Sequence, residues 1–148
     1  MLDKLRQLHL EIIQHLDAIK DITALPAPDM GRLVATRLAL TRASRSRTLL
    51  LESIYDELIS GSSEPTKAAI GALRAEGRAN LLVSIQHIGH WSLSEIAFRW
   101  TDYCMASATI QSAMRARIRR EVDLIYPLLS PTETAPSVSE PDTVTATA

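Results

Sequence analysis

Apolar residues recur every three or four positions along most of this chain, which is the spacing of one face of an α-helix. Charged residues separate the apolar positions of the first segment, which are Leu5, Leu8, Ile12, Leu16 and Ile19. No stretch shows the alternation of period two that a half-buried strand needs. The pattern therefore predicts an all-α protein with helices over residues 2–22, 30–60, 65–88 and 92–129.

Capping and turn residues mark the ends of these segments. Asp29 is the expected N-cap of the second helix, and Pro65 suits the first turn of the third. Gly89 is the expected C-cap of the third helix, and Ser92 and Glu95 have the spacing of a capping box. Because short connections favour antiparallel neighbours, we expect an up-down-up-down four-helix bundle.

The C-terminal segment, residues 131–148, differs in kind from the rest of the chain. It consists mostly of Pro, Thr, Ser, Ala and acidic residues, with no Lys, Arg or aromatic residue. Such a composition buries too little apolar surface to offset the entropy of ordering. We therefore expect a disordered tail that follows a bundle formed by residues 1–130.

Composition and charge narrow the classes of function. The chain has 5 Gly and 1 Phe, which argues against β-sandwiches, and its formal net charge of −1 predicts neither a nucleic-acid nor a membrane partner. Its single cysteine, Cys104, excludes an intrachain disulfide and a cysteine-based zinc site. The N-terminal residues mix charges with apolar groups, unlike a signal peptide or membrane span. We therefore expect a cytoplasmic protein.

Two polar residues fall on apolar helix faces, where burial is costly unless the groups are paired. His9 follows Leu5 by four positions and precedes Ile12 by three, whereas Glu121 precedes Ile125 by four. His9 lies near the start of the first helix and Glu121 near the end of the last. In an antiparallel arrangement these positions share a level, so the sequence predicts that His9 and Glu121 are close neighbours in the interior.

The segments around these two residues carry partial motifs. The last helix reads RIRRE at residues 117–121 and LIYPL at 124–128, and the first helix reads LHLEI at 8–12. These segments resemble hemerythrin-like (HHE cation-binding) proteins, whose last helix has a histidine, a glutamate four residues later and a hydrophobic-aromatic-proline ending. The resemblance implies a four-helix bundle with a di-iron or similar metal centre for oxygen, nitric oxide or iron handling.

The ligand set of that family is incomplete in this chain. Arg117 stands at the position of the last-helix histidine, and the resemblance leaves His9, Glu52 and Glu121 as metal ligands. Arg117 opposes cation binding and can neutralise Glu121 instead. We therefore expect a binding or regulatory module with a degenerate, empty metal site. The alternative is iron binding at His9, Glu52 and Glu121 for oxygen, nitric oxide or iron sensing.

A second group of polar residues lies on inward faces midway along the helices, and it is the candidate ligand-binding set. One interpretation is a polar cavity in which Arg37 binds a carboxylate or phosphate. The other interpretation is that small residues allow the helices to approach closely, while the side chain of Arg37 extends outward or pairs with Asp17 or Asp102. The set comprises Arg37, Ser44, Asn80, Ser84 and Tyr103.

Nothing else in the sequence points to an enzyme. The basic runs at residues 42–47 and 115–120 are interpreted as solvated helix faces. No Gly-rich phosphate loop, nucleophile elbow or metalloprotease motif occurs. His15 or His87 would suit histidine phosphotransfer, but no motif surrounds either residue. An enzyme with its own turnover is the least supported reading, and the expected partner is a small ligand or a protein.

Overall fold

The computed structural model describes residues 1–130 and is all-helical over that range, which confirms the predicted all-α class. The tail predicted at 131–148 lies outside the described residues. None of the helices within residues 1–130 is long and apolar enough to cross a membrane. In chain order the helices are α1 (Leu2–Thr23), α2 (Met30–Gly61), α3 (Glu64–His90), α4 (Leu93–Phe98) and α5 (Trp100–Leu129).

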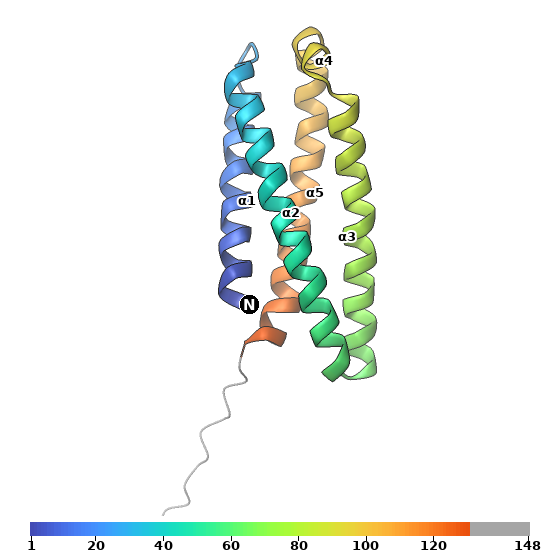
Figure 1. The fold of residues 1–148 in the computed structure, drawn as a ribbon. Coiled ribbons are helices and arrows are strands. Elements are labelled where there is room, and N and C mark those ends of the chain that lie inside the picture. Colours follow the sequence, from blue (N-terminus) through green and yellow to red (C-terminus); the bar gives the residue numbers. More distant parts are fainter. Residues whose placement is uncertain (131–148) are drawn as a thin grey trace, which may run out of the picture.

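The four long helices, α1, α2, α3 and α5, lie side by side, and the chain reverses direction at each connection between them (Figure 1). α1 packs against α2 and α5, and α3 packs against the same two helices. α2 and α5 therefore separate α1 from α3. The short helix α4 lies at the end of the molecule where α3 leads into α5 (Figure 1).

Side-chain caps begin three of the helices. Asp29 Oδ1 accepts the N–H of Arg32 at 3.3 Å, which confirms the predicted start of α2. Ser63 Oγ accepts the N–H three residues later at 3.4 Å and begins α3. Ser92 Oγ accepts the N–H of Glu95 at 3.2 Å, as the capping-box spacing predicts. Each cap satisfies one of the backbone donors that a helix start leaves open.

The predicted fourth helix is wrong in its continuity, because Arg99 interrupts it. This residue has φ −126° and ψ 53°, outside the helical region, and separates α4 from α5. Ile96 before the break and Tyr103 after it belong to the same apolar cluster at this end. Trp100 fixes the new direction, because its indole N–H donates to the carbonyl of Leu25 at 3.0 Å.

The predicted C-cap at Gly89 is also wrong. A glycine C-cap requires a positive φ, whereas no glycine in the described residues has one, and α3 continues through Gly89 to His90. Trp91 ends the helix, and its N–H donates to the carbonyl of His87 at 3.0 Å. The buried indole of Trp91 thus determines where the chain leaves α3.

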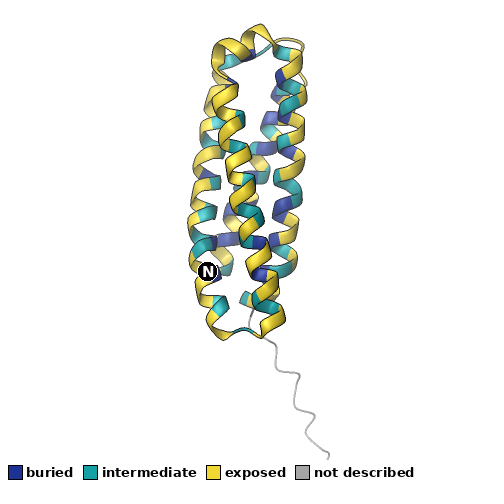
Figure 2. Ribbon diagram, turned by 90° about the vertical axis from the view of Figure 1, so that its right-hand side faces the viewer, coloured by how far each residue is buried: buried dark blue, intermediate teal, exposed yellow. Residues whose placement is uncertain are grey.

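Buried apolar residues form three clusters along the molecule, and Figure 2 shows the buried positions on inward helix faces. Ile70 and Leu73 join the cluster near the start of α3, together with Leu51 and Ile125. The middle cluster draws its buried residues from α1, α2 and α5. Beyond Leu73, α3 exposes a series of large apolar side chains: Leu81, Leu82, Val83, Ile85 and Ile88. The interior is therefore incompletely filled beside this part of α3.

Candidate functional site

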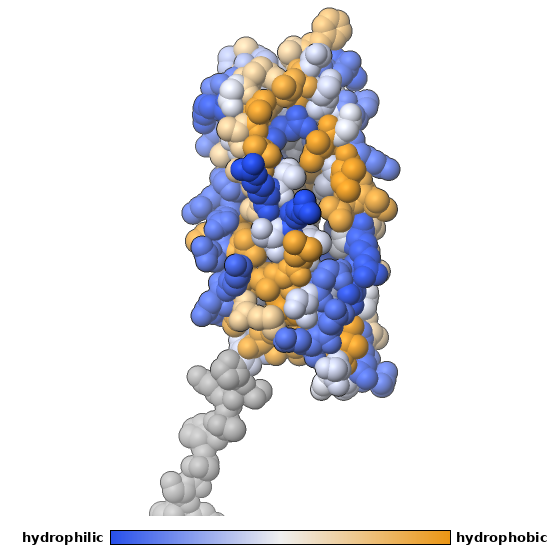
Figure 3. All heavy atoms as spheres, in the orientation of Figure 1, coloured by the Kyte–Doolittle hydropathy of each residue, from blue (hydrophilic) through white to orange (hydrophobic). Residues whose placement is uncertain are grey.

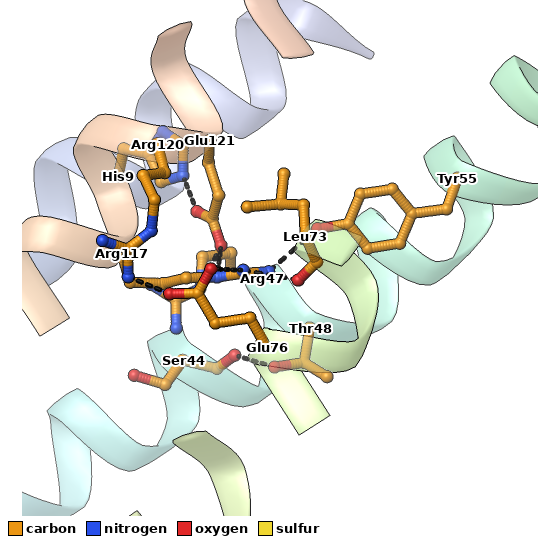
Figure 4. A network of polar contacts seen from close by, with 10 residues as sticks. All are labelled: His9, Ser44, Arg47, Thr48, Tyr55, Leu73, Glu76, Arg117, Arg120 and Glu121. Carbon is orange, nitrogen blue, oxygen red and sulfur yellow. Dashed lines mark hydrogen bonds and ion pairs between the residues drawn. The ribbon is translucent and has the colours of Figure 1, made fainter. Parts of the chain in front are cut away.

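Glu121 lies at the centre of a buried polar network that joins the long helices (Figure 4). Its Oε2 accepts a hydrogen bond from Nε2 of His9 at 2.6 Å, which confirms the predicted contact between these residues. Its Oε1 accepts from Nε of Arg117 at 3.0 Å, and Nε of Arg47 lies 3.9 Å away. One largely buried carboxylate thus faces three basic side chains.

Arg117 is fixed in place by several partners. Its guanidinium donates to the backbone carbonyl of Leu73, and Nη2 also donates to the hydroxyl of Tyr55 at 3.0 Å. The side chain is 5% exposed, so it is a buried cation with Glu121 as its counter-ion. Such a pair costs desolvation that only good geometry and further hydrogen bonds offset, and this site provides both.

The imidazole of His9 links Glu121 to the edge of the interior. Its Nδ1 lies 2.6 Å from the hydroxyl oxygen of Tyr126, and the two rings are stacked with centroids 5.6 Å apart. When Nε2 donates to Glu121, neutral His9 accepts the hydroxyl proton of Tyr126 at Nδ1. The chain of hydrogen bonds from Tyr126 through His9 to Glu121 therefore has a consistent direction.

Burial and charge act in opposite directions on the titration of this network. Burial disfavours ionised Glu121, yet the hydrogen bond from His9 and the charges of Arg47 and Arg117 together hold its pKa below the ordinary value. Burial lowers the pKa of Arg47. The charge of Glu121 raises this pKa, whereas the charge of Arg117 lowers it further. Burial raises the pKa of Tyr55 to about 12 despite Arg117. The network is thus a carboxylate held ionised by surplus positive charge.

The third predicted metal ligand, Glu52, is engaged by two arginines of α3. Its carboxylate accepts from Nε of Arg74 at 2.9 Å, and Nη2 of Arg78 is 3.5 Å from it. Within residues 1–130, no group of three or more His, Cys, Asp or Glu side chains is placed to hold a metal ion. His9 and Glu121 are together, but both oxygens of Glu121 already accept hydrogen bonds.

Beside the network, a cavity of about 500 Å³ lies between α2, α3 and α5, and Leu16 and Ile19 of α1 also line it. Figure 3 shows apolar side chains along both sides of a hollow between α2 and α3, with hydrophilic ones between them. Arg47, Arg117 and Glu121 line the cavity from the network side. The structure also brings to it all five residues of the predicted ligand-binding set: Arg37, Ser44, Asn80, Ser84 and Tyr103.

Arg37 lies toward the end of the cavity near Trp91. Its Nη1 donates to the carbonyl of Trp91 at 3.2 Å, and its guanidinium carbon lies 6.0 Å from the ring centre of Tyr103. The expected alternative partners, Asp17 and Asp102, instead bind Arg115 and Arg99. Pairing of Arg37 with either aspartate is therefore not observed, and this cation stays at the cavity.

Two buried polar atoms on α2 lack a hydrogen-bond partner within the described residues: Ser44 Oγ and Arg47 Nη1. Arg47 is not among the predicted site residues, because the basic run at residues 42–47 was interpreted as a solvated helix face. The helical spacing nevertheless indicates that Arg47 is buried, since it lies four residues after Ala43 and four before Leu51, and both of those residues are buried. Orphaned donors of this kind are rare in protein interiors and call for an explanation.

Comparisons with known proteins identify no family for this chain. No protein-family model matches it, and no solved structure matches it. A glutamine--tRNA ligase of Ralstonia nicotianae is 27% identical over 115 residues, which are 76% of this chain and 19% of the ligase. The chain thus spans about a fifth of the length of that curated relative. The resemblance to hemerythrin-like proteins stays a prediction.

Proposed function

We propose that this chain is a binding module that holds a small amphipathic molecule in the cavity between α2, α3 and α5. In this proposal the scaffold is a hemerythrin-like, up-down-up-down four-helix bundle. The ion network of His9, Arg117 and Glu121 takes the place of a metal centre. Occupation of the cavity, rather than metal chemistry, is the event to which the module responds.

The cavity itself is the main support. Its volume of about 500 Å³ lies within the range of roughly 300–1,000 Å³ that is usual for small-molecule sites. Gly77, Asn80 and Ser84 line it from α3, together with the partly exposed apolar side chains of the same helix, Leu81, Val83, Ile85 and Ile88. The small and polar residues among them leave space that larger side chains would fill.

The competing hypothesis of iron binding at His9, Glu52 and Glu121 has less support. Glu52 is engaged by Arg74, and Arg47 and Arg117 bring two positive charges to the carboxylate that would have to bind the metal. A cation at this place would displace existing hydrogen bonds and meet electrostatic repulsion.

Binding of Nile red, a neutral dye whose emission rises in apolar surroundings, tests the proposal. We expect saturable binding to the wild-type protein. Ser84→Phe, which adds a ring inside the cavity, should weaken it at least tenfold. Leu82→Phe is the matched control, because Leu82 lies on the same helix, is 62% exposed and does not line the cavity. No saturable binding to folded wild-type protein, or equal effects of the two variants, would contradict the proposal.

A further inference from the structure

Ser44 and Arg47 form a pair of donors that point to a specific chemical group. They are three residues apart on α2, so their side chains lie on one face of the helix, and both line the cavity. Neither Ser44 Oγ nor Arg47 Nη1 has a hydrogen-bond partner within the described residues. The hydroxyl of neighbouring Thr48 is already used, since it donates to the backbone carbonyl of Ser44 at 3.0 Å. The hydroxyl of Ser44 and Nη1 of Arg47 are therefore two hydrogen-bond donors that a ligand can use.

The side chain of Arg47 is 12% exposed, so water gives it little compensation. Its Nε lies 3.9 Å from Glu121, close enough for an ion pair but too far for a hydrogen bond. Glu121 already accepts from His9 and Arg117. A buried guanidinium without its own hydrogen-bonded anion is costly, and a bound acceptor would remove that cost.

The charge around the cavity favours an anion. The two carboxylates that line it, Glu52 and Glu121, are each shared by two guanidinium groups. Burial and the neighbouring charge of Arg117 both lower the pKa of Arg47, which is the effect expected of an under-compensated cation. The lining arginines are Arg37, Arg45, Arg47, Arg74, Arg78 and Arg117. Asp56 and Glu76, which do not line the cavity, also pair with Arg74 and Arg117. None of the ion pairs within residues 1–130 includes Arg37 or Arg45, so positive charge remains in excess at the cavity.

The number of donors distinguishes a carboxylate from a phosphate. A carboxylate has two oxygens, which match the hydroxyl of Ser44 and Nη1 of Arg47. A phosphate group has a further oxygen and a charge near −2, and the extra oxygen would be buried without a donor from this pair. The donor set therefore fits the smaller, singly charged group.

The rest of the cavity fits an apolar group. Arg37 lies seven residues before Ser44, so the helical rise places it about 10 Å farther along α2. The wall between these two levels is largely aliphatic. Its side chains come from all three helices and include Leu40, Leu81, Ile85, Ile110 and Met114.

We propose that the ligand of this cavity is a medium-chain monocarboxylate. Its carboxylate accepts from Ser44 Oγ and Arg47 Nη1, and its alkyl chain lies along the aliphatic wall toward Arg37. This inference rests on the proposed binding function and specifies its ligand class.

Displacement of Nile red by three probes of equal chain length tests the inference. The probes are octanoate, octanol and octyl phosphate. We expect octanoate to displace the dye at least tenfold more effectively than either of the others. Equal displacement by octanoate and octanol would overturn the carboxylate assignment, and stronger displacement by octyl phosphate would overturn it in favour of a phosphate. Failure of the wild-type protein to bind Nile red would instead overturn the binding function itself.

Substitutions locate the head group. Arg47→Met removes the guanidinium and keeps an apolar chain, and it should abolish the preference of the protein for octanoate over octanol. Ser44→Ala should weaken octanoate binding several-fold and leave octanol binding unchanged. Arg42→Met is the matched control, because Arg42 is exposed on the same helix and does not line the cavity. An unchanged preference in Ser44→Ala and in folded Arg47→Met would overturn the assignment. If Arg47→Met fails to fold, the preference of Ser44→Ala for octanoate over octanol tests the assignment alone.

Discussion

The guanidinium of Arg117 occupies the space that a side chain at Gly77 would need. A Cβ atom built on Gly77 would lie 2.6 Å from Nη2 of Arg117 and 3.1 Å from its guanidinium carbon. The guanidinium cannot easily move away, because it donates to Glu121, to Tyr55 and to the carbonyl of Leu73. The absence of a side chain at residue 77 thus allows a buried cation to lie between α3 and α5.

Alanine substitution of two glycines in α3 tests this relationship. Gly71→Ala should stabilise the protein by about 0.5–1 kcal/mol, because a Cβ there meets nothing within 4 Å and alanine is the better helix former. Gly77→Ala should destabilise it, because the methyl group displaces Arg117 from its partners. Urea unfolding measures both changes. If Gly77→Ala proved as stabilising as Gly71→Ala, the guanidinium would not be held as described.

Removal of the Glu121 carboxylate should be among the most damaging single changes. Glu121→Ala leaves Arg117 and Arg47 buried without their shared counter-ion, which should cost roughly 3–5 kcal/mol. Glu121→Gln should cost less, because the amide keeps the shape and accepts at one oxygen. Chemical denaturation gives both values. A cost for Glu121→Ala within error of zero would show that the network contributes nothing to stability.

The lowered pKa of Glu121 predicts a pH dependence of stability. The unfolded chain takes up a proton near the ordinary value of 4.5, whereas the folded protein takes it up only at lower pH. Ionised Glu121 therefore stabilises the fold above pH 4.5, and this contribution is lost as the pH falls from there through the folded pKa. Melting temperatures from pH 7 to pH 3 measure it. The curve of Glu121→Gln should fall less steeply over this interval, and parallel curves would contradict the assignment.

Metal analysis separates the binding-module proposal from the iron alternative. Protein purified without an affinity tag of histidines should contain iron well below one atom per chain. A chelator should leave its helical circular dichroism unchanged, because apolar packing and the ion network hold the helices. Stoichiometric iron that disappears in Glu121→Gln would instead favour the alternative.

The spacing of apolar residues predicted most of the helical structure because it is a local property. The same periodicity turned His9 and Glu121 inward and, with antiparallel helices, brought them to one level. The break at Arg99 was not predictable in this way, since it depends on the contact of Trp100 with distant Leu25. Arg47 was missed because its charge suggested solvent, whereas its helical phase indicated burial. Glu52 was predicted as a metal ligand from the family resemblance, whereas in the structure Arg74 on α3 binds its carboxylate.

The sparse packing of α3 beyond Leu73 also determines which part of this protein should unfold locally most readily. Residues 79–88 lie between an anchored start, at Ile70 and Leu73, and the buried indole of Trp91. Their backbone amides should exchange with solvent through local unfolding, at a free energy below that of global unfolding. An occupant of the cavity would supply the contacts that these residues lack. Ligand binding would then be recorded as slower hydrogen exchange in one stretch of helix, a change in dynamics that needs no change in shape.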